Sequence, residues 1–119
     1  MGIESKSFDE PDERRAPDKT AVDVVRLSGA SVARTTFQPG WRWSECVKPV
    51  VGTDSCQARH LGVLVAGTLE VTHEDGSRQT LTAGNAYSIA PGHDAWVVGD
   101  EVVVGFEFES TTAETYAKA

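Results

Sequence analysis

The sequence predicts an all-β fold, either a sandwich, a jelly roll or a small closed barrel. Short β-branched segments alternate apolar and polar residues, which is the pattern of strands with one buried face. Turn residues separate these segments every ~8–12 residues, and no segment has the apolar spacing of a long amphipathic helix. The chain of 119 residues has the length of one domain, and its 39% hydrophobic residues can form a core without disulfides or structural metals.

A polar N-terminal segment precedes the expected strands. Residues 1–20 are rich in charge and contain Pro11 and Pro17, so their composition predicts a flexible arm. Alternatively, the segment lies along the barrel or along a neighbouring subunit. From residue 21 the composition becomes β-branched, and strands are expected at 21–27, 31–37, 57–66, 68–73, 78–81, 87–90, 95–98 and 102–108.

Turns rich in glycine connect these strands. The strongest signal is Glu74-Asp75-Gly76, because glycine accepts the positive φ that a tight hairpin turn requires. A long connection is expected between residues 41 and 55. The expected organisation is therefore an arm at 1–20, a β-barrel at 21–110 and a C-terminal tail or loose helix at 111–119.

The charge of the chain argues against two classes of partner. A net charge of −7 repels nucleic-acid phosphates and anionic lipid surfaces. No apolar run approaches the ~20 residues of a membrane span, and the charged N-terminus lacks the apolar stretch of a signal peptide. A cytoplasmic location is expected, where Cys46 and Cys56 are reduced thiols rather than a disulfide.

Two blocks of the sequence resemble the motifs of the cupin family. The segment from His60 to Val71 (HLGVLVAGTLEV) is similar to the end of the first cupin motif, in which a glycine and a hairpin strand follow an acidic residue. The segment from Gly84 to Trp96 (GNAYSIAPGHDAW) is similar to the second motif, and a variable hairpin separates the two. The stretches at 40–45 and 91–101 resemble a group of small single-domain bacterial cupins. The resemblance implies a cupin-type double-stranded β-helix, or jelly-roll barrel, and a homodimer.

The sequence departs from the usual ligands of metal-binding cupins. The family carries two histidines one residue apart, then a glutamate, and a further histidine in the second motif. By resemblance, these four positions fall on Asp54, Cys56, His60 and Ala95. No position keeps its usual ligand. However, Cys56 and His60 are residue types that bind metals, and His93 lies two residues before the fourth position.

A divalent metal site is expected around Cys56, His60 and His93. In a continuous strand, the side chains of Cys56, Ala58 and His60 share one face, so a thiolate and an imidazole would stand close together. His93 would reach the same cavity from an adjacent turn, and Cys46 is a fourth candidate from the long connection. Sulfur and nitrogen ligands suit Zn²⁺ best, with Fe²⁺, Ni²⁺ and Mn²⁺ as alternatives.

Two other interpretations of the same residues stay open. Without a metal, His60 or His93 would be catalytic as a general base in an isomerase- or lyase-like reaction, because histidine titrates near neutral pH. In the second interpretation, the barrel is a non-catalytic module that binds or senses a small molecule. In that case the cysteines are small buried hydrophobes and the histidines are hydrogen-bonded core residues.

Aromatic residues are candidates for the wall of a ligand cavity. The side chains of Trp41, Trp43, Tyr87 and Trp96 would either pack in the core or stack against a flat small molecule.

Carboxylates near the motifs have two interpretations. Glu45 and Asp94 are candidates for orienting a histidine, although solvent exposure is the simpler expectation. In the last expected strand, alternation places Phe106 and Phe108 on one face and Glu107 on the other.

Overall fold

A computed structural model describes residues 2–108 and 111–118 of the chain. The described residues are mainly strands, which confirms the expected all-β class. In chain order the strands are β1 (Glu13–Arg15), β2 (Thr20–Leu27), β3 (Ala30–Phe37), β4 (His60–Ala66), β5 (Thr68–His73), β6 (Arg78–Thr82), β7 (Ala86–Ile89), β8 (His93–Val97) and β9 (Val103–Phe108).

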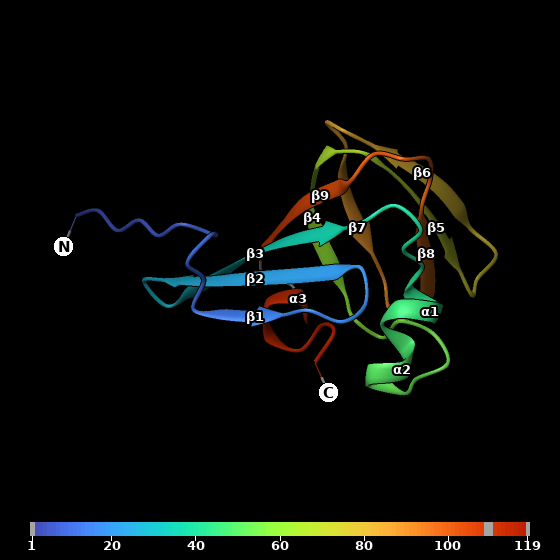
Figure 1. The fold of residues 1–119 in the computed structure, drawn as a ribbon, viewed down its shortest axis with the longest axis horizontal. Coiled ribbons are helices and arrows are strands. Elements are labelled where there is room, and N and C mark those ends of the chain that lie inside the picture. The colour runs from blue at the N-terminus through green and yellow to red at the C-terminus, as the bar shows by residue number, and fades with distance from the viewer. Residues whose placement is uncertain (1, 109–110, 119) are drawn as a thin grey trace.

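The strands form two antiparallel sheets that face each other (Figure 1). One sheet has six strands in the order β1-β2-β3-β9-β4-β7, and the other has three in the order β6-β5-β8. The six-stranded sheet joins distant parts of the chain, because β9 lies between β3 and β4. This arrangement is a cupin jelly roll, in which inward side chains of both sheets share one interior.

The observed strands lie close to the expected ones, with one difference that matters for the site. Strand β4 starts at His60 and not at residue 57, so the expected continuous strand from Cys56 to His60 is wrong. The reason is that Cys56 forms an isolated bridge with His93 on β8. The Cys56 amide donates to the His93 carbonyl at 2.7 Å, and the Gly92 amide donates to the Cys56 carbonyl at 2.7 Å. Cys56, Ala58 and His60 are nevertheless all buried.

The N-terminal segment contributes an edge strand to the larger sheet. Strand β1 pairs with β2, with Arg14 opposite Asp23, so the sheet begins before residue 21. The Phe8 ring packs against Phe106 with centroids 5.2 Å apart. Part of the segment expected to be an arm therefore lies along the barrel of its own chain, whereas the first described residues extend away from it (Figure 1).

Three short helices occupy the connections and the C-terminus. Helices α1 (Trp43–Cys46) and α2 (Lys48–Val51) form the long connection and lie beside one end of the barrel (Figure 1). Gly52 ends α2 in a left-handed conformation with φ of 80°. Helix α3 (Thr111–Glu114) opens a C-terminal segment that is packed rather than a loose tail, because Tyr116 is only 5% exposed.

The core fills the space between the sheets. Fully buried valines come from β2 and β9, and the Trp41 ring stacks on Phe37 with centroids 3.9 Å apart. The Trp41 indole donates to the Thr20 hydroxyl at 2.8 Å, so its polar atom is satisfied within the core. In the described part of the chain, no helix is both long and apolar enough to span a membrane.

Candidate metal centre

Three potential metal ligands from three parts of the chain meet inside the barrel. Cys56, His60 and His93 each offer one donor atom, and these atoms all lie within 4.8 Å of one another. The three residues are 2%, 5% and 4% exposed, respectively. The structure thus brings together the three residues that the sequence proposes as principal ligands.

Backbone pairing sets the positions of these residues. The bridge between Cys56 and His93 holds their backbones side by side. His60 is the first residue of β4 and pairs with Ile89 on β7, which leads into the turn before His93. The Cys56 Sγ lies 3.8 Å from the His60 Nε2, which is a sulfur hydrogen-bond distance.

A buried carboxylate orients the His60 ring. The His60 Nδ1 lies 2.7 Å from the Glu107 Oε1 and 2.6 Å from the Thr112 Oγ1. With Nδ1–H donating to this pair, Nε2 faces Cys56. A carboxylate behind a histidine is the arrangement that fixes the tautomer of metal-binding histidines.

The Glu107 carboxylate is itself held on both oxygens. The Tyr87 hydroxyl donates to Oε2 at 2.8 Å, and the Thr112 hydroxyl donates to Oε1. Gly62 makes room for this group, because a Cβ there would collide with the Phe106 carbonyl and lie 2.8 Å from the Glu107 Cγ. Glu107 is 4% exposed, so its charge acts without screening by bulk water.

The second histidine is oriented by the backbone. The His93 Nδ1 donates to the Ala90 carbonyl at 2.8 Å, which leaves Nε2 as the free nitrogen. The His93 and His60 rings meet edge to face with centroids 5.1 Å apart. Both histidines therefore have a fixed Nδ1 and an available Nε2.

Mutual contacts outweigh burial in setting the protonation of these groups. Burial raises the pKa of Cys56, but hydrogen bonds and charge interactions with His60 and His93 lower it to about 7. Burial lowers the pKa of His60, but Glu107 and Cys56 raise it to about 10. Burial raises the pKa of Glu107, but His60 holds it below its ordinary value. Without a metal, the site therefore favours Cys56 as a thiolate, His60 as an imidazolium and Glu107 as a carboxylate.

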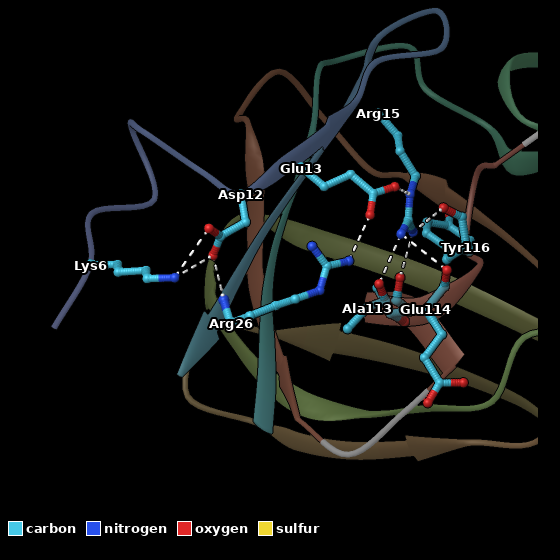
Figure 2. Close-up of polar contacts among 9 residues, drawn as sticks. Lys6, Asp12, Glu13, Arg15, Arg26, Ala113, Glu114 and Tyr116 are labelled. Carbon is cyan, nitrogen blue, oxygen red and sulfur yellow. Dashed lines mark hydrogen bonds and ion pairs between the residues drawn. The ribbon is translucent and has the colours of Figure 1, made fainter. Parts of the chain in front are cut away.

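The C-terminal segment closes the barrel over His60. Tyr116 packs edge to face on the His60 ring at 5.0 Å. The buried Arg15 guanidinium holds this segment by donating to four backbone carbonyls, those of residues 112, 113, 114 and 116, at 2.8–3.1 Å (Figure 2). Glu13 in turn fixes the Arg15 side chain at 2.7 Å. The N-terminal strand thus anchors the segment that supplies Thr112 to the site.

An inner cavity and an outer hollow adjoin the centre. An inner cavity of about 30 Å³ is lined by His60, His93 and Glu107 and has room for a water molecule or two. A hollow of about 190 Å³ lies between α2 and the C-terminal segment and includes Cys56 in its wall. A larger open groove of about 420 Å³ lies between β6 and β7, but it contains none of the three candidate ligands.

Two residues proposed from the sequence lie elsewhere. Cys46 is buried, but it is not part of the ligand group, and its Sγ contacts the Asp18 Oδ2 at 3.9 Å. Trp96 does not line the inner cavity, because alternation along β8 turns it outward when Ala95 faces inward. The Arg42 guanidinium lies over the Trp96 ring at 4.3 Å.

The other proposed residues divide between the cavity and the surface. Trp41, Trp43 and Tyr87 line the inner cavity. Glu45 is exposed, with its carboxylate 3.7 Å from the Arg42 guanidinium, and Asp94 accepts from the Ser44 amide at 3.2 Å. The two free cysteines agree with the expectation of reduced thiols.

Glu107 and Thr112 are the functional residues that sequence reasoning missed. The alternation of β9 left open which face is buried, and a strand with two phenylalanines suggests the wrong one. The signal that could have identified Glu107 is the pair of strand glycines, Gly62 and Gly105, which marks a close approach on its face. Thr112 has no signal in the sequence, because its role depends on the folding back of the C-terminus.

Comparisons with known proteins show the fold. A scan of family models and a search of curated proteins find no match. Among solved structures, a protein of unknown function from Rhizobium leguminosarum bv. viciae 3841 is similar (TM-score 0.63, 15% identity, 91% of this chain and 97% of that chain). A sugar phosphate isomerase of the cupin superfamily from Silicibacter pomeroyi is also similar (0.62, 16%, 88% and 74%). So is a cupin-like protein from Thermotoga maritima (0.53, 16%, 81% and 77%). These likenesses confirm the expected cupin fold.

Proposed function

We propose that this cupin-fold protein binds a divalent metal ion through Cys56, His60 and His93 and uses it to act on a small molecule. The observation that carries the proposal is the orientation of the donors. Both histidines have Nδ1 engaged by an oxygen acceptor, which leaves Nε2 as the nitrogen for a metal, and all three donor atoms lie within 4.8 Å of one another. Such second partners hold ligating histidines in place in known metal sites.

The donor set fits zinc better than the alternatives. One thiolate and two imidazoles are typical zinc ligands, and three protein ligands leave a fourth tetrahedral position for water or substrate. Mononuclear iron, nickel and manganese sites are more often completed by oxygen ligands than by a thiolate. The low pKa of Cys56, about 7, also reduces the cost of forming the thiolate that a metal requires.

The chain's own residues would do three things around such a centre. Cys56, His60 and His93 would hold the metal, which supplies Lewis-acid chemistry and an acidified water when bound. Glu107 would keep His60 in the Nδ1–H tautomer. The aromatic wall formed by Trp41, Trp43 and Tyr87 would exclude bulk water from the inner cavity.

The test is the metal content of tag-free protein purified without chelator, measured by elemental mass spectrometry. About one zinc per chain is expected for the wild type. The double variant His60→Gln/His93→Gln should lose the metal while keeping its far-ultraviolet circular dichroism. His73→Gln is the matched control, because the His73 Nε2 donates to the Pro91 carbonyl and is not part of the ligand group.

Cobalt substitution reports on the sulfur ligand directly. Cobalt-loaded wild type should show sulfur-to-metal charge-transfer absorption, and Cys56→Ser should abolish that absorption. Metal well below stoichiometric, even after reloading with zinc or cobalt, would contradict the proposal.

A second candidate function needs no metal. Cys56, His60 and Glu107 form a continuous hydrogen-bonded series, with contacts of 3.8 Å and 2.7 Å, that can move a proton. This geometry supports acid–base chemistry of an isomerase or lyase type. Turnover that persists in chelator-treated protein and disappears in His60→Gln would favour this candidate.

A further inference from the structure

The wall between the inner cavity and the outer 190 Å³ hollow is thin. Trp43 and Tyr116 line both spaces, and Cys56 lies in the wall of the outer one. The inner cavity of about 30 Å³ is too small for any organic ligand, whereas the outer hollow has the volume of about six water molecules. A small molecule in the outer hollow would therefore lie against Cys56 without entering the barrel.

The described side chains that line this hollow include a lysine and no carboxylate. Lys118 is the only cation among them, although the chain has a net charge of −7. Val47, Val51 and Ala58 provide apolar walls. A small anion with a short apolar part is the ligand that such surroundings favour.

A buried hydrogen-bond donor supplies a second, independent observation. Trp43 is 2% exposed, and its indole Nε1 has no hydrogen-bond partner among the described residues. Buried N–H groups in native proteins nearly always have an acceptor, so an unpartnered one needs an explanation. A ligand oxygen between the two cavities would satisfy it.

We infer that the hollow between α2 and the C-terminal segment is a binding site for small carboxylates, with Lys118 attracting the anion and the Trp43 indole donating to one of its oxygens. As the ligand class of the metal centre, the inference rests on the proposed function. As a binding site beside Cys56, it can be tested on the metal-free chain.

The probe is a pair of thiol reagents of nearly equal size, iodoacetate and iodoacetamide. Each alkylates Cys56 when the sulfur attacks the CH₂ carbon and iodide leaves, but only iodoacetate carries a carboxylate. The rate ratio of iodoacetate to iodoacetamide at Cys56, followed by peptide mass spectrometry on chelator-treated protein, is divided by the same ratio for glutathione. This normalised ratio is independent of the ionised fraction of the thiol, because both reagents meet the same sulfur.

The wild type should give a normalised ratio of about ten or more, the gain expected when a carboxylate meets both a cation and a neutral donor. Lys118→Glu should lower it about fivefold. Lys48→Glu is the matched control, because it changes the net charge equally but does not line the hollow. It should leave the ratio within twofold of the wild type.

The indole donor is tested by Trp43→Phe, which should lower the ratio about tenfold. Trp96→Phe is its control, since Trp96 lines neither cavity and lies under the Arg42 guanidinium. A wild-type ratio near one, or equal effects of Lys118→Glu and Lys48→Glu, would overturn the inference even if Trp43→Phe fails to fold. Metal content is measured separately, so loss of the carboxylate site and loss of the metal centre give different results.

Discussion

The two cysteines of this protein are almost equally buried, at 4% for Cys46 and 2% for Cys56, yet their surroundings are chemically opposite. Cys46 ends α1, and its sulfur contacts the carboxylate of Asp18 at 3.9 Å. Cys56 lies beside two imidazoles, with donor atoms of all three residues within 4.8 Å of one another. Contacts with the two histidines lower the pKa of Cys56 to about 7.

The difference shows that burial alone does not make a cysteine functional. Both thiols occupy core positions, and a cysteine at either position has the chemistry of a zinc ligand. What separates them is the backbone bridge from Cys56 to His93, which brings a second segment of the chain to the sulfur. The region around Cys46 packs as core, and the region around Cys56 assembles three donors.

Replacing Cys56, but not Cys46, should have the largest effect on zinc affinity. Cys56→Ser should weaken zinc binding by more than ~100-fold, because it removes a ligand and not only an outer partner of one. Cys46→Ser should leave zinc affinity within about twofold. Competition with a chromophoric chelator measures both affinities, and equal losses in the two variants would remove the distinction between the regions.

Removing the carboxylate behind His60 should have the next largest effect. Glu107→Gln should lower zinc affinity about 10–100-fold, because an amide holds the Nδ1–H tautomer less firmly than a carboxylate does. Glu70→Gln is the control, since Glu70 is also buried but accepts from Arg78 and Thr80, outside the ligand group. An unchanged affinity in Glu107→Gln would show that His60 needs no orienting partner.

Thiol reactivity should distinguish the cysteines in the metal-free protein. With a pKa of about 7, Cys56 should react with iodoacetamide about tenfold faster at pH 7 than an unperturbed thiol of equal access, and its rate should level off above pH 8. Cys46 should react more slowly than Cys56 across this range, because it is buried and lacks the contacts with His60 and His93. Peptide mass spectrometry resolves the two adducts, and faster labelling of Cys46 would contradict the comparison.

The smallest expected effect is on the pH dependence of stability without metal. The pKa of Cys56 is lower in the folded chain than its ordinary value, so its contribution is lost as pH falls through about 7. The pKa of His60 is raised to about 10, so its contribution is complete below its ordinary value near 6.5 and is lost as pH rises through 10.

Between about pH 7 and pH 9 the gain from Cys56 offsets the loss from His60, so stability should change little there and should fall by on the order of 1–2 kcal/mol as the pH rises from about 9 to 10.5. Urea unfolding at pH 6, 8 and 10.5 measures this dependence. Cys56→Ala removes this offset, so its stability should already fall between pH 6 and pH 8, whereas Cys46→Ala should keep the wild-type shape. Identical curves for wild type and Cys56→Ala would show that the pair contributes nothing to folding.

The expected strands were largely correct because alternation and turn residues are local properties. Thr68–His73 was predicted with its observed bounds, since Gly67 and Gly76 delimit it clearly. Strand β1 was not predicted, because three charged residues acquire a strand conformation only through pairing with β2. The start of β4 was misplaced because a bridge to a distant strand competes with local continuation.

The site was only partly predictable, for the same physical reason. The spacing of Cys56 and His60 and the position of His93 identify three candidate donors. The orientation of the His60 ring depends on Glu107 and Thr112, which lie 47 and 52 residues beyond His60 in the chain. Periodicity gives the two faces of a strand, but it does not say which face the rest of the chain will cover.

The sequence by itself determined the all-β class, the positions of most strands and the residue types able to bind a metal. Those features depend on side-chain period, turn conformation and ligand chemistry, all of which act over a few residues. Only the tertiary structure decided that Cys56 and not Cys46 joins the histidines, that Glu107 points inward, and that the C-terminal segment closes over His60. These features depend on contacts between distant segments, because a buried polar group is stable only where the fold brings a partner to it.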